Sequence, residues 1–158
     1  MFAFPEPHES NAFLVDHVRL LRSSLQQLTG MDLVDATLDD AGAASALFHA
    51  PFVVVSHNTA EDPIFNYANK TALGLFEMNW EQFTSLPSRL SAEAPNREER
   101  ARLLAEVTVN GCIRNYAGVR ISSQGRRFRI SEATVWNLLD EEGIYRGQAA
   151  MFHQWQFL

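Results

Sequence analysis

The fold is decided by residues 51–76, which read PFVVVSHNTAEDPIFNYANKTALGLF. Two short apolar runs, 51–57 and 64–68, are separated by the turn-forming cluster NTAEDP, which predicts a β-hairpin. Asn69 is a good N-cap and predicts a short helix over residues 70–78. The segment therefore predicts two strands that lead directly into a helix.

The rest of the chain extends this pattern. Residues 79–93 predict short helical turns, and residues 96–111 predict a longer helix that is capped by Asn96 and ends at Gly111. The last third predicts three strands, over residues 113–121, 126–139 and 144–157. We therefore expect an α+β protein with a five-stranded antiparallel sheet, helices inserted after the second strand, and an N-terminal helix, which is the order of the PAS fold.

The N-terminal helix is expected to begin at a Ser10 or Asn11 cap and to end at Gly30. Its apolar residues are spaced in heptads, which suits packing either on the chain's own sheet or against the same helix of a second chain; they are Leu14, Val18, Leu21, Leu25 and Leu28. We expect this helix to build a homodimer, with packing on its own sheet as the alternative. Residues 1–30 are thus interpreted as an arm with an amphipathic helix, and residues 31–158 as the PAS-like domain.

The turn SSQG at residues 122–125 sets the register of the two strands beside it. If Ser122 lies opposite Gly125, Val119 opposes Phe128, and an apolar face is separated from an arginine-rich face. The expected inward face carries Asn115, Phe128, Ile130, Glu132 and Trp136. The other face is either a solvated surface or a platform for an anion or a partner protein, made of Arg114, Tyr116, Arg120, Arg127 and Arg129.

Composition excludes several classes of function. The formal net charge of −6 argues against bulk nucleic-acid binding, and the single cysteine excludes an internal disulfide or a cysteine-rich metal site. No apolar run approaches the ~20 residues of a membrane helix, so we expect no membrane contact. The first residues carry no positive side chain, so we expect no signal peptide and a cytoplasmic location.

Several further motifs carry a family resemblance. Segment 51–76 looks like the opening of a PAS domain, with Tyr67–Asn69 leading into its first helix. The runs EMNWEQFTSLPSRLSAE, YAGVRISSQGRRFRI, VWNLLDEEG and GQAAMFHQW resemble the MEKHLA family, a PAS-like module that occurs alone in microbes and algae and at the C-terminus of plant homeodomain–leucine-zipper regulators. The resemblance covers about residues 12–156. The chain shows no homeodomain, so we expect no direct nucleic-acid binding.

The resemblance implies a sensor or regulatory module rather than an enzyme. PAS-like domains bind small molecules between sheet and helices, or dimerise, and pass their state to a partner protein. The candidates for contacting an unknown small molecule are His57, Asn66, Trp80, Asn115, Phe128, Glu132, Trp136 and Gln148. Two alternatives stay open: an interaction or dimerisation module without a ligand, and a small enzyme that uses a pocket carboxylate such as Glu132, or His57.

The cofactor of such a module is unknown from the sequence. Light-sensing PAS domains carry a reactive cysteine where this chain reads LPSRLSAE, so no cysteinyl-flavin is expected. A non-covalent flavin is left open, because Asn137 and Gln148 lie on the last strands. The PAS resemblance implies no haem, because haem-binding PAS domains carry a histidine on the long helix and helix 96–110 has none. The five histidines are too scattered for a metal site.

Overall fold

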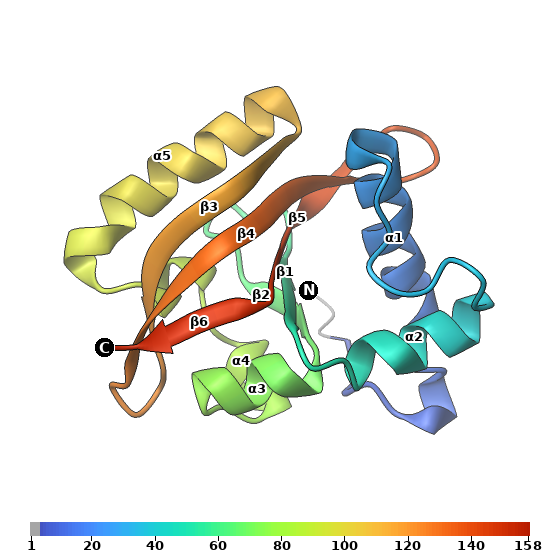
Figure 1. The fold of residues 1–158 in the computed structure, drawn as a ribbon, viewed down its shortest axis with the longest axis horizontal. Helices are drawn as coiled ribbons and strands as arrows, with labels where there is room; N and C mark the ends of the chain where they lie inside the picture. Colours follow the sequence, from blue (N-terminus) through green and yellow to red (C-terminus); the bar gives the residue numbers. More distant parts are fainter. Residues whose placement is uncertain (1–3) are drawn as a thin grey trace.

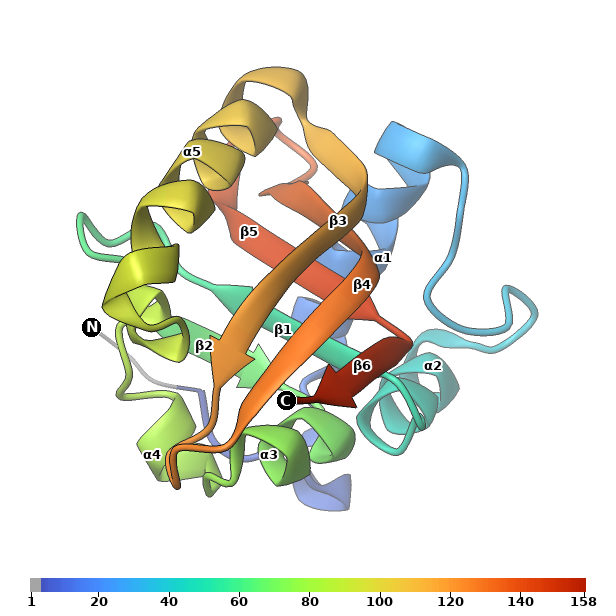
Figure 2. The same ribbon diagram turned by 60° about the vertical axis from the view of Figure 1, so that its left-hand side comes forward.

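The computed structural model describes residues 4–158, an antiparallel sheet with helices against both faces (Figures 1 and 2). The helices are η1 (Glu9–Asn11), α1 (Val15–Thr29), α2 (Asp40–Phe48), α3 (Lys70–Phe76), α4 (Trp80–Phe83), η2 (Ser88–Ser91) and α5 (Ala94–Asn110). The strands are β1 (Val53–His57), β2 (Phe65–Ala68), β3 (Cys112–Ile121), β4 (Arg127–Leu139), β5 (Tyr145–Phe152) and β6 (Gln154–Phe157). Within these residues no helix has the length and apolar character needed to cross a membrane.

The sheet has one strand more than the sequence predicts in the described part of the chain. Its strands are ordered β2–β1–β5–β4–β3, and β6 pairs with the first half of β4. The single expected strand over residues 144–157 is therefore wrong, because the chain bends at His153 and separates β5 from β6. The α+β class and the insertion of helices after β2 are confirmed.

Each face of the sheet has its own helices (Figures 1 and 2). Trp136 on β4 is fully buried among side chains of α1 and α2, and its indole Nε1 donates to the Leu21 carbonyl at 3.2 Å. The preceding residue, Val135, packs on the opposite face against Leu103 and Val107 of α5. Adjacent residues of β4 thus contact different helical layers, as the pleat of a strand requires.

The N-terminal helix covers its own sheet. Val18, Leu21 and Leu25 are at most 1% exposed and belong to the cluster around Trp136. The heptad spacing therefore serves packing inside the chain, which was the alternative to a dimer, and the homodimer stays a prediction. Gly30 ends α1 with a φ of +75°, as expected.

The expected start of this helix is wrong. The helix begins at Val15 rather than at a Ser10 or Asn11 cap, because Ala12, Phe13 and Leu14 all adopt positive φ. Residues in that conformation cannot continue a right-handed helix.

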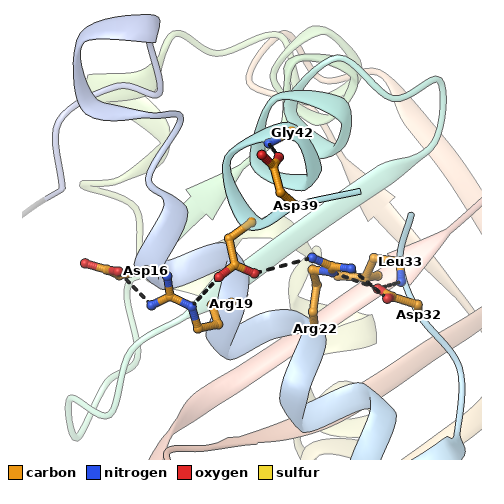
Figure 3. A network of polar contacts seen from close by, with 8 residues as sticks. Asp16, Arg19, Arg22, Asp32, Leu33, Asp39 and Gly42 are labelled. Carbon is orange, nitrogen blue, oxygen red and sulfur yellow. Dashed lines mark hydrogen bonds and ion pairs between the residues drawn. The ribbon is translucent and has the colours of Figure 1, made fainter. Parts of the chain in front are cut away.

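Ion pairs fix α1 to the connector that follows it and to α2 (Figure 3). The Arg22 guanidinium donates to both carboxylate oxygens of Asp32, at 2.9 and 2.8 Å. Arg19 donates to Asp16 at 2.9 Å and to Asp40 of α2 at 3.1 Å. Of these pairs, Arg22–Asp32 is the least exposed, and its bidentate geometry is the stronger kind of ion pair.

The turn between β3 and β4 is one residue longer than the sequence suggests. Ser122 N donates to Arg126 O at 3.0 Å, and Gly125 adopts a φ of +80° at the end of a three-residue loop. Arg120 therefore opposes Phe128, and the expected register, with Val119 opposite Phe128, is wrong. A shift of one residue moves each side chain to the other face, so Arg120 points inward.

A second irregularity lies further along the same strands. Asn115 and Glu132 adopt φ values of +61° and +52°, and the pairing of β3 with β4 shifts there. Both side chains are exposed, so their expected inward orientation is wrong. The bulge also reverses the faces beyond it, so Trp136 faces α1 rather than the helices inserted after β2.

In the helices inserted after β2, the expected cap at Asn69 and the expected end at Gly111 are confirmed. Asn69 caps α3 by accepting a hydrogen bond from Ala72 N at 3.1 Å, and Gly111 ends α5 with a φ of +92°. The expected cap Asn96 is wrong, because α5 begins at Ala94 after Glu93. Pro95 then lies in the first turn, where its missing N–H leaves no intrahelical bond unmade.

Candidate functional site

A small cavity lies between the inner face of the sheet and α5. Its volume is about 60 Å³, enough for a few water molecules at the roughly 10–15 Å³ that each requires. Its walls are mostly apolar and include Val55, Phe65, Phe76, Leu103, Ile130 and Phe152. The polar lining includes His57, Ser91, Arg100, Tyr116, Arg120 and Gln148. A few polar groups converging on an apolar cavity are typical of a ligand site. The volume restricts an occupant of this cavity to a very small molecule.

The Ser88 hydroxyl connects two of these polar groups. Arg100 Nη2 donates to Ser88 Oγ at 3.0 Å, and His57 Nδ1 lies 2.8 Å from the same oxygen. Because the hydroxyl oxygen already accepts from Arg100, its proton is free to be donated to His57 Nδ1. The chain of hydrogen bonds therefore joins η2, α5 and β1 beside the cavity.

The imidazole of His57 beside the cavity is neutral at neutral pH because its pKa is lowered. Burial lowers the pKa of His57 from 6.5 to about 4, and the positive charge of Arg100 acts in the same direction. A side-chain hydrogen bond with Gln148 opposes this shift but does not overcome it. At neutral pH the imidazole therefore contributes hydrogen bonds to the site and no charge.

Two arginines bring positive charge to the cavity. Arg100 and Arg120 are 9% and 8% exposed, respectively. Burial, followed by the nearby Arg120, lowers the pKa of Arg100 to about 10, so Arg100 stays charged at neutral pH. The Arg120 guanidinium donates to Val119 O at 2.9 Å and to Tyr116 Oη at 3.1 Å. Within residues 4–158, neither arginine forms an ion pair with a carboxylate.

The amides of Asn137 and Gln148 hold α5 on the sheet. Asn137 Nδ2 donates to Val107 O at 3.0 Å, and Gln148 Nε2 lies 3.2 Å from Leu104 O. Gln148 Nε2 also lies 3.1 Å from Asn137 Oδ1. Both amides therefore bond to the protein itself, and the non-covalent flavin stays an open alternative.

Of the eight ligand candidates named from the sequence, the structure places His57 and Gln148 in the cavity wall. Phe128 is fully buried next to it, in the cluster that contains Ile130 and Phe76. These three candidates share the face of the sheet that α3 to α5 cover.

The structure places the other five candidates elsewhere. Trp80 and Trp136 belong to the cluster on the α1 side, and Asn66 accepts a hydrogen bond from Ser56 at 2.5 Å, outside the cavity wall. Asn115 and Glu132 are exposed, and Glu132 accepts a hydrogen bond from Gln154. The idea of an enzyme with Glu132 as its pocket carboxylate therefore fails, because the bulge turns this side chain away.

The expected arginine platform is divided between two faces of the sheet. Arg120 and Tyr116 line the cavity, whereas Arg114, Arg127 and Arg129 are exposed. Arg127 also forms an ion pair with Glu93 before α5. A continuous surface of all five residues is therefore wrong, and the reason is the longer turn between β3 and β4.

Sequence reasoning missed Arg100 and Ser88. The signal for Arg100 was its helical spacing: Arg100, Leu103 and Val107 are three, four and seven residues apart and form the buried face of α5. Ser88 carried no comparable signal. In the part of the chain that the structure describes, no three His, Cys, Asp or Glu side chains are grouped as metal ligands.

Residues 15–157 match the family described as the MEKHLA domain. This chain belongs to the MEKHLA domain family. The matched range includes α1, so the helix that covers the outer face is part of the module that the family shares.

Plant proteins contain relatives of this MEKHLA domain. Homeobox-leucine zipper protein ATHB-14 of Arabidopsis thaliana is 26% identical over 147 residues, which are 89% of this chain and 17% of the plant protein. Homeobox-leucine zipper protein HOX10 of Oryza sativa subsp. indica is 24% identical over 130 residues, 82% of this chain and 16% of that protein. The chain thus spans only a small fraction of the length of these relatives.

Solved structures confirm the PAS-like fold of this MEKHLA domain. The PAS domain of a protein from Colwellia psychrerythraea has a TM-score of 0.60 at 15% identity, covering 73% of this chain and 92% of that one. An RNA-binding light-oxygen-voltage receptor has a TM-score of 0.62 at 14% identity, covering 75% of this chain and 34% of that one. At these identities the likeness establishes the fold.

Proposed function

We propose that this MEKHLA domain is a regulatory module that binds a small molecule in the cavity and reports its presence to another protein. The observation that carries the proposal is the composition of the wall. Arg100, Leu103 and Leu104 of α5 face the same cavity as Val55 and Gln148 of the sheet. An occupant therefore touches the sheet and α5 together.

Helix α5 is suited to pass on such a contact. Its buried residues are Arg100, Leu103 and Val107, and most of its other side chains face outward, with Val109 83% exposed. The helix forms hydrogen bonds with the sheet side chains Asn137 and Gln148 and with Ser88, and of the residues in these bonds Gln148 and Arg100 line the cavity. A ligand that alters these bonds changes the position or mobility of a surface that a partner can contact.

Hydrogen exchange tests this proposal. The wild-type protein is incubated with a protein-free extract of small molecules from cells, and amide exchange is followed by mass spectrometry. We expect exchange to slow in α5 and to stay unchanged at the outer end of α1. Ala150→Leu fills the cavity and should abolish the effect, whereas Ala117→Leu on the exposed side of β3 should retain it. Equal exchange with and without extract, or an equal response of the filled variant, would overturn the proposal.

A second copy of this chain is the partner that we propose for such a contact. Because Val18, Leu21 and Leu25 are buried within the chain, the dimer must use a surface other than the apolar stripe of α1. Light scattering of the full chain at high concentration tests this, and a monomeric mass would overturn it. The pure interaction module without a ligand predicts a dimer together with an empty cavity.

A further inference from the structure

The cavity contains an imbalance of charge. Arg100 and Arg120 are the two arginines that are buried in the described part of the chain, and both lack a carboxylate partner there. Exposed or half-buried arginines such as Arg22 and Arg127 do have one. Within residues 4–158, ion pairs are thus missing at the two arginines where an unpaired charge is most costly.

The hydrogen bonds of the two guanidinium groups are also incomplete. Each guanidinium has five N–H donors. Arg100 donates to Ser88 Oγ, and Arg120 donates to Val119 O and Tyr116 Oη, with its guanidinium 5.5 Å from the centre of the Tyr116 ring. Most of these donors therefore have no acceptor among residues 4–158, and their nitrogens reach the cavity or the solvent, because Tyr67 Oη is the one fully buried side-chain N or O atom there without a partner. A buried charge without partners is costly, so native proteins pair it with an opposite charge.

The remaining cavity wall supplies no negative charge. No Asp or Glu of the described residues lines the cavity, and His57 is neutral at pH 7. The two positive charges also repel each other, because Arg120 helps to lower the pKa of Arg100. A neutral or cationic occupant would leave this imbalance in place.

We propose that the cavity binds a small organic anion whose oxyanion group, a carboxylate or a phosphate, lies between Arg100 and Arg120. The planar guanidinium suits such groups because it donates two parallel hydrogen bonds to them. With a volume of about 60 Å³, the cavity leaves room beside the oxyanion only for a very small body, such as a methyl group, against the apolar wall of Val55, Phe76, Ile130 and Phe152. This inference rests on the proposed function and names the ligand class of the same site.

Thermal unfolding with matched acids and amides tests the charge requirement. The probes are formate, acetate and inorganic phosphate, which suit a cavity of about 60 Å³, compared with formamide and acetamide at constant pH and ionic strength. We expect at least one anion to raise the Tm by roughly 5–10 °C at a concentration a hundred times its Kd. The amides should have no such effect. The organic acids and phosphate distinguish the two oxyanion types, and this comparison on the wild-type protein needs no variant.

Variants assign the effect to the two arginines. Arg100→Met and Arg120→Met should abolish the rise in Tm, whereas Arg129→Met, which removes an exposed charge, should retain it. Without ligand, the two cavity variants should melt at or above the wild-type Tm, because replacing an uncompensated buried charge by an apolar side chain of similar size removes a cost. A large drop in Tm in both, with no anion response in the wild type, would make the arginines purely structural and overturn the proposal.

Two other outcomes distinguish failure of the anion proposal from failure of the proposed small-molecule-sensing function. If the amides stabilise the wild type as strongly as the acids do, the proposal that the ligand is an anion is overturned. The proposal that the cavity senses a small molecule would then stand. A protein that responds to no probe, and whose α5 exchange is unchanged by cell extract, would overturn both.

Discussion

Arg120 lies directly opposite Phe128 in the β3–β4 hairpin, and this pairing turns a guanidinium into the core. A turn shorter by one residue would send Arg120 to the solvent and leave the cavity with a single arginine. The length of the turn at Gly125 therefore determines the chemistry of the site.

Substitution of the turn glycine tests this pairing. Gly125→Ala should lower the free energy of unfolding by about 1–2 kcal/mol, because Gly125 has a φ of +80° and a β-carbon is disfavoured there. No atom beyond Gly125 and its two chain neighbours lies within 4 Å of where that carbon would sit, so the cost is conformational. Gly74→Ala in α3 is the matched control, since its site is equally open, and it should be neutral or stabilising. Urea denaturation measures the free energy of unfolding of both variants. Equal changes in the two would contradict the three-residue turn with Gly125 at positive φ.

Asn69 is predicted to contribute more than an ordinary helix cap. Besides capping α3 through Ala72, its Nδ2 donates to Leu47 O at 3.1 Å and to Phe52 O at 2.7 Å. Asn69→Ala should therefore cost about 2–4 kcal/mol, because it leaves buried backbone groups without partners. Asn79→Ala removes an exposed cap and should cost about 1 kcal/mol. Equal losses in urea denaturation would show that the additional bonds contribute nothing.

Trp136 is predicted to hold α1 on the sheet. Trp136→Ala should cost about 3–5 kcal/mol, the range for emptying a large buried aromatic site. Trp136→Phe keeps most of the packing but loses the bond to Leu21 O, and should therefore cost less. Guanidinium denaturation followed by circular dichroism checks both. A loss below about 1 kcal/mol for the alanine variant would mean that the indole is not in this core.

We expect two buried histidines to make the protein less stable in mild acid. Burial lowers the pKa of His17 and of His57 from 6.5 to about 4. Between about pH 6.5 and pH 4 the unfolded chain therefore binds protons that the folded chain does not, so the free energy of unfolding falls as the pH falls. Each histidine adds at most about 1.4 kcal/mol per pH unit to this slope.

Urea denaturation as a function of pH measures the slope. His57→Gln should reduce it between pH 6.5 and pH 5, and His17→Gln should do the same from the other face of the sheet. A wild-type stability that is constant across this window would contradict neutral burial of the two rings.

The local signals in the sequence were sufficient for most of the fold. The hairpin and helix over residues 51–76, the Asn69 cap and the helix ends at Gly30 and Gly111 follow from short-range turn and capping chemistry. The order of these elements then gives the PAS-like architecture.

The site itself depended on features that short patterns do not specify. A three-residue turn and a two-residue turn are both compatible with SSQG, yet they place Arg120 on opposite faces. The bulge at Glu132 needs a positive φ in a residue that rarely adopts one, so nothing in the alternation of side chains predicts it. Arg100 was detectable in principle, because it continues the buried spacing of Leu103 and Val107.

Native mass spectrometry of the freshly purified protein tests the central claim most directly. The account predicts that the wild-type chain carries an additional small mass, that this mass is released on denaturation and detected as a negative ion, and that Arg100→Met and Arg120→Met carry less of it. A wild-type protein with the bare mass of the polypeptide, or a bound molecule that is neutral or cationic and equally retained by both variants, would contradict the account.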